Sequence, residues 1–323
     1  MLDQIFSKID KRIPLTREDA MTLLSVPNLS GEYHALIRKA AEISRRDFGS
    51  KGYIFVQIGL NAAPCSGNCS FCSLAQCNFT GEETSEKSLE AVLEQVSQID
   101  YQRVTAVFLM TTADFDADRF LEYGRQVRKI LPPQIALVAN TSDFDAAYAR
   151  QMKKAGFTGV YHIVRLREGI DTAISPETRI QSLDAAAEAG LRIYYCLEPI
   201  GPEHTYDEMV TEMLRARAYH VDVMAAMRRV SVDRTCFAGR NMIDDAELTK
   251  IVAVTRLVVM PGISMNVHEP NRAAMAAGVN QLYAEIGVNP RDHSRETEAS
   301  RGFSVEQVTR MLKDNGYHPC IEA

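Results

Sequence analysis

The chain has 323 residues, of which 46% are hydrophobic and 24% charged, and its formal net charge is −6 at pH 7. This composition argues against disorder, and the slightly negative charge argues against binding of nucleic acid or anionic membrane. The charged N-terminus lacks the features of a secretory signal, and no apolar run reaches the roughly 18 residues that span a bilayer. We therefore expect a cytoplasmic protein built around one large domain.

The first fifty residues predict helices that precede the main domain. Thr16 is followed three residues later by Asp19, as in a capping box, and residues 31–46 form a charged amphipathic stretch. We expect residues 1–50 to form an N-terminal helical segment. Residues 51–323 then form the main domain with its C-terminal helix and tail.

From residue 51 onward, short β-forming runs alternate with amphipathic stretches of helical length. Such alternation is typical of parallel βαβ units, and eight strands in about 230 residues fit a (β/α)8 barrel. The alternative is an open doubly wound sheet, which would need a glycine-rich turn after its first strand, where this chain has cysteines. The expected strands lie near 53–60, 103–110, 134–140, 158–164, 191–197, 221–227, 262–267 and 279–284, and the expected helices are 86–98, 116–131, 143–155, 176–189, 206–219, 244–259 and 271–277.

Three of the seven cysteines lie within eight residues, directly after the first expected strand. Cys65, Cys69 and Cys72 form a C-x3-C-x2-C motif in which Gly67 and Asn68 permit a tight turn. Three thiolates leave one iron of a 4Fe–4S cluster open, whereas a closed zinc site takes four ligands, and the sequence has no second pair of cysteines in a knuckle. The spacing therefore favours an iron–sulfur cluster over zinc or three unrelated thiols.

With Phe71 directly before the third cysteine, this motif resembles that of the radical S-adenosylmethionine (SAM) superfamily. The resemblance implies a 4Fe–4S cluster whose open iron binds the amino and carboxylate groups of SAM. It also implies reductive cleavage of SAM to methionine and a 5′-deoxyadenosyl radical. An electron donor such as flavodoxin or ferredoxin is the partner that this chemistry requires, while the oligomeric state, a homodimer included, stays open.

Within that superfamily, the chain from about residue 50 onward is most similar to biotin synthase and to the enzymes that mature hydrogenase or form methylornithine. The resemblance assigns Thr111 and Thr112 to the amino group of SAM and Arg179 to its carboxylate. It assigns the turn Pro199-Ile200-Gly201 to the adenine, and residues 302–319 to the last helix and tail. Each landmark also has a structural alternative, such as a strand end for the threonines and a solvated helix residue for the arginine.

Arg165 and Glu168 follow the fourth expected strand in the segment VRLREGIDT. The acidic group suits the ammonium or ribose hydroxyls of SAM, and the arginine suits a carboxylate. This pattern is nearer to the hydrogenase-maturation relative than to ordinary biotin synthase, which has Asn-x-Asn-x-Asp there. The identity of the substrate therefore stays open, whereas the cofactor assignment does not depend on it.

Ordinary biotin synthases hold a 2Fe–2S cluster, their sulfur donor, on three cysteines and one arginine. The resemblance places these four ligands at Leu109, Val138, Cys196 and Asn266. Because Cys196 is the one position of these four that has a ligand side chain, we do not expect that cluster here.

Cys77, Cys196 and Cys236 each lie near the C-terminal end of an expected strand, so the three could face one cavity. This pattern is similar to a divergent anaerobic branch of biotin synthases with a larger auxiliary cluster. The alternative for each is a buried, inert thiol. Cys320 follows the last helix, and we expect it outside the cavity.

The leading hypothesis is sulfur insertion into unactivated C–H bonds, with dethiobiotin to biotin as the specific reaction. Cys196, Cys236 and Arg228 are the catalytic candidates. Arg228 and Arg229, at the end of the sixth expected strand, are both candidates for binding the carboxylate of a small substrate, and we expect one of the two to be structural. One alternative is an enzyme that rearranges or cleaves a small amino acid without sulfur insertion, and another is a non-catalytic cluster or metal carrier. Further polar candidates, not ranked, are Arg234, Arg240, His268, Glu269, Arg291 and His293.

Overall fold

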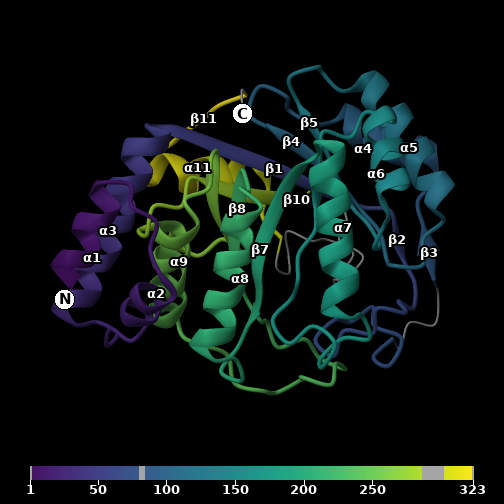
Figure 1. Cartoon of the computed structure of the whole chain (residues 1–323). Helices are drawn as coiled ribbons and strands as arrows, with labels where there is room; N and C mark the ends of the chain where they lie inside the picture. The colour runs from purple at the N-terminus through teal and green to yellow at the C-terminus, as the bar shows by residue number, and fades with distance from the viewer. Residues whose placement is uncertain (1, 80–83, 286–301, 322–323) are drawn as a thin grey trace.

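The computed structural model describes residues 2–79, 84–285 and 302–321 (Figure 1). Within these ranges, eight parallel strands close into a barrel, because the last strand pairs with the first. This confirms the expected (β/α)8 architecture. The strands are β1 (Lys51–Gly59), β4 (Ala106–Met110), β5 (Ala136–Asn140), β6 (Gly159–Tyr161), β7 (Arg192–Ile200), β8 (Val223–Arg228), β9 (Ser264–His268) and β10 (Gln281–Glu285).

The helices that follow the strands begin where the sequence supplies a capping side chain. Each starts after a Ser, Thr, Asp or Asn whose oxygen accepts a hydrogen bond from the backbone N–H three residues later. Local chemistry therefore sets the starting points. The helices are α4 (Leu89–Ser97), α5 (Ala117–Ile130), α6 (Ala146–Lys154), α7 (Pro176–Ala189), α8 (Tyr206–Ala218), α9 (Asp245–Val259), α10 (Arg272–Met275) and α11 (Val305–Asp314).

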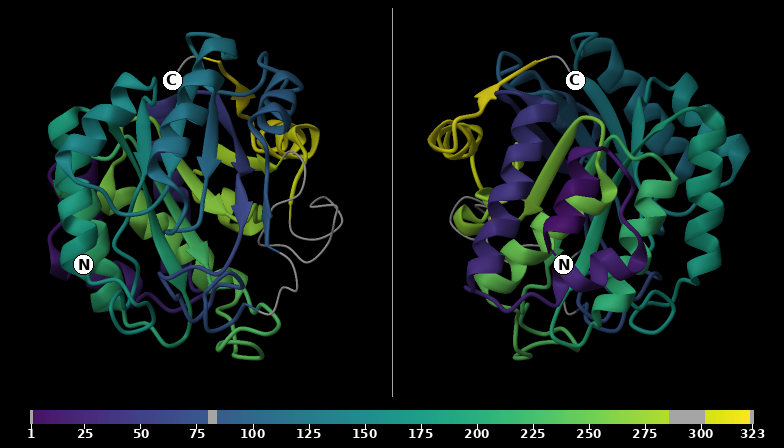
Figure 2. Two further views of the ribbon diagram at one scale, coloured as in Figure 1. Left: turned by 90° about the vertical axis from the view of Figure 1, so that its right-hand side faces the viewer. Right: turned by 60° about the vertical axis from the view of Figure 1, so that its left-hand side comes forward.

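The N-terminal segment forms α1 (Leu2–Asp10), α2 (Arg17–Leu24) and α3 (Gly31–Phe48), which lie outside the barrel (Figure 2). The capping box of Thr16 and Asp19 is present, and α2 packs against α8 while α3 packs along α9. Arg256 of α9 is fully buried and donates to Asp47 Oδ2 at 2.7 Å and to Ser44 Oγ at 2.9 Å. A buried ion pair therefore joins the N-terminal helices to the barrel.

Alternate residues of the strands face opposite sides of the barrel wall. In β1, Phe55 packs inside the barrel, while Ile54 and Val56 pack against the surrounding helices. The ring centroid of Phe108 lies 5.2 Å from that of Tyr194 and 5.3 Å from that of Tyr283. Aromatic side chains thus fill the interior of the barrel below the C-terminal ends of the strands, and space remains at those C-terminal ends.

Three short strands lie outside the barrel proper. β2 (Asn61–Ala62) and β3 (Ser85–Glu86) form an antiparallel pair on either side of the cysteine segment, and β11 (His318–Pro319) pairs with the start of β1. Thr105, directly before β4, donates to the carbonyl oxygen of Cys320 at 2.8 Å. Cys320 therefore lies at the N-terminal end of the barrel, as expected. No helix within the described ranges has the length and apolar character of a membrane span.

Candidate active site

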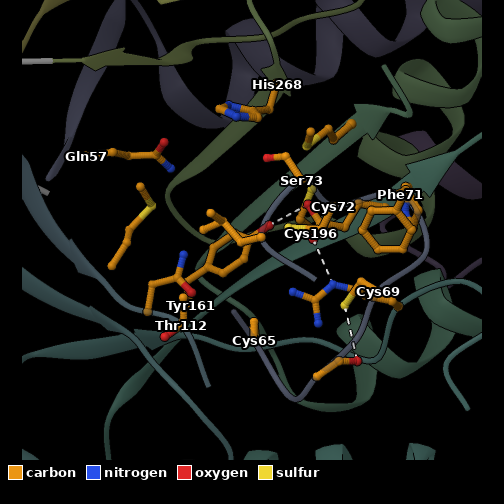
Figure 3. A pocket seen from close by; sticks show the side chains of 18 of the residues that line it. Gln57, Cys65, Cys69, Phe71, Cys72, Ser73, Thr112, Tyr161, Cys196 and His268 are labelled. Carbon is orange, nitrogen blue, oxygen red and sulfur yellow. Dashed lines mark hydrogen bonds and ion pairs between the residues drawn. The ribbon is translucent and has the colours of Figure 1, made fainter. Parts of the chain in front are cut away.

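The C-terminal ends of the barrel strands surround a pocket (Figure 3), the end at which enzymes of this architecture place their chemistry. It contains about 1530 Å³ of empty space, open solvent at its mouth included. Its lining includes the predicted residues Cys65, Cys69, Phe71, Cys72, Thr111, Thr112, Arg165, Arg179 and Cys196, and also His268 and Glu269.

The three motif cysteines come from one irregular loop after β1 and share the pocket wall. Asn68 turns the loop with φ of 49°, and the N–H of Cys72 donates to the carbonyl of Cys69 at 2.9 Å. A Cβ on Gly67 would lie 3.2 Å from Ile174 Cδ1 and 3.5 Å from Cys65 Sγ. The backbone therefore approaches the thiol closely at Gly67.

The donor set fits a 4Fe–4S cluster better than a single zinc ion. All three thiols are free and line the same cavity. In the described part of the chain, no three His, Cys, Asp or Glu residues are placed to share one metal ion. Each thiolate of a cluster binds its own iron atom, so its sulfurs stand farther apart than the ligands of one ion.

The metal-free thiol of Cys69 is a weak acid, since burial raises its pKa to about 11. Iron binding therefore has to displace the thiol proton.

The two threonines after β4 are held in place from the cysteine side of the pocket. The side-chain amide of Asn61 donates to Thr112 Oγ1 at 2.8 Å, and its oxygen accepts from the backbone N–H of Thr112 at 3.0 Å. The hydroxyl of Thr111 donates to Thr141 Oγ1 at 3.1 Å. Both threonines therefore present fixed polar groups at the pocket.

Arg165, Glu168 and Arg179 form one buried charge network. Arg165 Nε lies 3.4 Å from Glu198 Oε1, and the backbone N–H of Arg165 donates to Glu168 Oε2 at 2.9 Å. Arg179 lies 3.4 Å from Glu168 and 3.2 Å from Asp143. Arg179 is 6% exposed, so the alternative of a solvated helix arginine is wrong.

His162 completes this network behind Arg179. Its Nε2 lies 3.0 Å from Asp143 Oδ1. Burial lowers the pKa of His162, which favours the neutral ring. Burial raises the pKa of Asp143, but the hydrogen bond with His162 and the charge of Arg179 outweigh it and lower the pKa overall. Asp143 is therefore the anion that fixes the guanidinium of Arg179.

Cys196 lies in the pocket wall on β7. The hydroxyl of Tyr161 donates to Glu198 Oε2 at 2.8 Å beside it, and Cys196 itself is 1% exposed. Burial raises the pKa of the Cys196 thiol well above its usual value. Cys196 is therefore a neutral thiol that faces the cavity.

Cys77 and Cys236 lie elsewhere, outside the residues that line the pocket. Both are exposed, and partial burial together with the neighbouring thiol of Cys236 raises the pKa of Cys77. The Cys236 N–H and thiol both donate to Asn78 Oδ1, and the Asn78 amide donates to the carbonyl of Cys72 at 3.0 Å. The structure thus joins two of the three additional cysteines beside the cluster loop and separates them from Cys196, against the expectation of one shared cavity.

The structure places three further candidates away from the pocket. Arg228 donates to Asp245 Oδ1 at 2.8 Å on the α9 side, and its neighbour Arg229 lines the pocket instead. Ile200 packs in the core against the helices, and the Gly201 N–H donates to His204 Nδ1 at 3.0 Å. Of the predicted adenine turn, Pro199 lines the pocket. Arg291 and His293 lie outside the described residues.

Leu109 also faces the helices, so the expected equivalence with a ligand of the 2Fe–2S cluster is wrong at this position. Its neighbours Phe108 and Met110 face the barrel interior or the pocket, as do Val138 and Cys196. Among these strand residues that face the interior or the pocket, Cys196 is therefore the single cysteine.

The sequence analysis did not find several residues that organise the site. Asn61, Asn78, Asp143, Tyr161 and Glu198 hold the candidate residues through the contacts described above. Tyr161 ends β6 and Glu198 lies two residues before the end of β7, and this position near a strand end is the signal that marks them in the sequence. The asparagines carry no such signal because their partners come from distant segments.

Comparison with known proteins matches residues 64–227 to the family model described as the Radical SAM superfamily. The biotin synthase of Brachyspira hyodysenteriae is 23% identical over 98% of this chain and 94% of its own length. That of Fusobacterium nucleatum subsp. nucleatum is 20% identical over 96% and 88%. The crystal structure of methylornithine synthase (PylB) is 17% identical with a TM-score of 0.83, covering 98% of this chain and 97% of that one.

A structure of HydG, a maturase of the [FeFe]-hydrogenase, is similar with a TM-score of 0.81 and 17% identity, covering 98% of this chain and 75% of that one. These likenesses in structure concern the fold, and the family model spans the cysteine loop and the strands up to β8. The chain therefore belongs to the radical SAM superfamily, and with that membership come the 4Fe–4S cluster and the SAM that its cysteine loop predicts.

Proposed function

We propose that the protein inserts sulfur into unactivated C–H bonds and converts dethiobiotin to biotin. The observation that carries this proposal is the thiol pair of Cys77 and Cys236 beside the cluster loop. Sulfur insertion needs a donor, and this pair would supply two of the ligands of a second iron–sulfur cluster. The similarity to biotin synthases over almost the whole chain supports the same reaction.

Different residues of the pocket would have different roles. Cys65, Cys69 and Cys72 would hold the first cluster, and the polar groups of Thr112 and Arg179 would orient SAM. When bound, this cluster and SAM supply the one-electron chemistry that breaks an unactivated C–H bond. The aromatic interior beneath the pocket excludes water, which protects such chemistry from side reactions. A flavodoxin or ferredoxin would deliver the electrons.

A second candidate is the rearrangement or cleavage of a small amino acid without sulfur insertion. It is favoured by the positions that the resemblance assigns to the ligands of the sulfur donor in ordinary biotin synthases. Cys196 is the one cysteine among them, and Val138 packs in the apolar interior of the barrel. Such an enzyme would need no second cluster. The two functions therefore differ in the iron content that they require.

The test compares wild-type protein with the Cys77→Ala/Cys236→Ala variant, both purified and reconstituted anaerobically. We expect wild type to form biotin from dethiobiotin and to hold clearly more than the roughly four irons of one cluster. The variant should hold about four irons and cleave SAM to 5′-deoxyadenosine, but form no biotin. Equal iron in both proteins would favour the second candidate, and no SAM cleavage by either would indicate a carrier. Cys196→Ala, with its thiol in the pocket wall, serves as the matched comparison for iron content.

A further inference from the structure

Arg229 directly follows β8 and lines the pocket while being 1% exposed. Its Nε donates to Glu203 Oε1 at 2.6 Å, and its Nη2 donates to Glu203 Oε2 at 3.1 Å and to the carbonyl of Asn241 at 2.7 Å. The ring of Phe237 lies 5.4 Å from the guanidinium carbon. These contacts fix the plane of the guanidinium before any ligand binds.

The third nitrogen of this guanidinium is unused. A guanidinium has five N–H groups, and the contacts above use those of Nε and Nη2. Nη1 is buried and has no hydrogen-bond partner in the described ranges of the chain. A buried donor without a partner costs free energy, so its presence in a pocket wall points to an acceptor that a ligand brings.

We propose that Nη1 of Arg229 binds the carboxylate of the substrate, an inference that rests on the proposed function and names the part of the substrate that this pocket recognises. A charged acceptor makes the stronger hydrogen bond with a guanidinium. All three arginines that line the pocket are paired with carboxylates of the protein, Arg165 with Glu198, Arg179 with Asp143 and Arg229 with Glu203. Within the described part of the chain, their buried donors without a hydrogen-bond partner are Nε of Arg179, which faces Glu168 Oε2 at 3.4 Å, and Nη1 of Arg229.

Arg229 is separated along the sheet from the cluster loop, and its backbone N–H donates at 2.7 Å to the carbonyl of Ile200 in the turn that the resemblance assigns to the adenine. The positive charge of Arg165 is close enough to the thiol of Cys69 to oppose the rise in its pKa, so Arg165 lies beside the cluster loop. Arg229 follows β8, which is three strands from β1 by way of β9 and β10. A carboxylate held there leaves the cluster side of the pocket to SAM.

The residues around Arg229 define the rest of the ligand. Ala225, Met227, Val230 and Val232 line the same pocket on either side of it. An apolar surface next to a single anion site suits an aliphatic chain that ends in a carboxylate. The substrate class is therefore an aliphatic carboxylic acid, which includes dethiobiotin, whose reacting carbons would extend from Arg229 toward the cysteine loop.

The test measures binding of dethiobiotin and of its methyl ester to the cluster-loaded enzyme with SAM, by equilibrium dialysis. We expect wild type to prefer the acid roughly ten- to hundredfold over the ester. Arg229→Gln/Glu203→Gln removes the guanidinium without leaving a buried carboxylate unpaired, and it should bind both compounds equally. Arg229→Lys should keep part of the preference.

Arg240→Gln is the matched control, since Arg240 stacks on the same Phe237 at 3.8 Å but lies outside the pocket lining. It should keep the full preference, and the affinity for SAM should be equal in all variants. A preserved preference in Arg229→Gln/Glu203→Gln, or a loss of SAM affinity there, would overturn the inference and leave sulfur insertion untouched.

If wild type binds neither dethiobiotin nor its ester, sulfur insertion into dethiobiotin is wrong. The same comparison between common amino acids and their amides then decides the role of Arg229. A preference for the acid that is lost when Arg229 is replaced supports the inference. If the protein shows no preference for the acid, the inference is wrong.

Discussion

The side-chain oxygen of Asn78 accepts hydrogen bonds from both the backbone N–H and the thiol of Cys236, each at 3.1 Å. The amide of the same side chain donates to the carbonyls of Ser70 and Cys72 in the cluster loop. One buried asparagine therefore connects the segment that binds the first cluster to the loop after β8.

Asn78→Ala should loosen both loops at once. The loss of its hydrogen bonds leaves the part-buried carbonyl of Ser70 without its donor and the N–H of Cys236 without its acceptor. It should lower the free energy of unfolding by about 1–3 kcal/mol. Iron should also be lost faster to a chelator, because the cluster loop is less well fixed. Chemical denaturation and the rate of iron release measure the two effects. Asn28→Ala is the control, since Asn28 also donates one amide hydrogen bond, to Glu247 far from the pocket, and unchanged iron release in both variants would contradict the prediction.

Cys69→Ala should abolish the cleavage of SAM, because two thiolates hold a 4Fe–4S cluster poorly. Production of 5′-deoxyadenosine by the anaerobically reconstituted variant is the measurement. Cys320→Ala removes a cysteine at the other end of the barrel and should cleave SAM at the wild-type rate. Normal 5′-deoxyadenosine production by Cys69→Ala would refute the assignment of the cluster loop.

Arg179→Ala should weaken the binding of SAM while leaving the cluster in place. Asp143 holds the guanidinium of Arg179 at the pocket, so its loss removes a charge-assisted hydrogen bond. The expected decrease in affinity is roughly ten- to hundredfold, measured by titration of SAM. Arg150→Ala, which breaks an exposed ion pair with Glu188, is the control. Unchanged affinity in Arg179→Ala would mean that this arginine is purely structural.

Asp47→Asn should destabilise the junction between α3 and α9. Burial raises the pKa of the Asp47 carboxyl, but the hydrogen bond and charge of Arg256 outweigh it and lower the pKa overall. The variant leaves a buried guanidinium without its counter-charge, which costs roughly 3–5 kcal/mol. Urea unfolding at pH 7 measures this difference.

The same substitution predicts a pH dependence with a defined sign. A carboxyl with a lowered pKa in the folded state contributes stability above its unfolded pKa, about 4, and loses it as the pH falls further. The difference in free energy of unfolding between wild type and Asp47→Asn should therefore shrink below about pH 4. A difference that stays constant down to pH 3 would contradict the ion pair as its cause.

The sequence by itself determined the barrel and the cluster loop. Alternating strands and helices follow from local periodicity, and residues such as Thr16, Ser88 and Ser175 start their helices through local hydrogen bonds. The three motif cysteines lie within eight residues, so their convergence requires one loop and no distant contact. Both features depend on neighbours along the chain.

The tertiary structure alone decided which side chains face the pocket and which distant residues meet there. Arg228 and Arg229 are neighbours at the end of β8, where the regular alternation of the strand ends, so the sequence leaves open which of them faces the pocket. Cys236 meets Cys77 rather than Cys196 because the loop after β8 folds back onto the cluster loop. Such pairings depend on the closure of the barrel, which brings together residues more than 150 positions apart in the sequence.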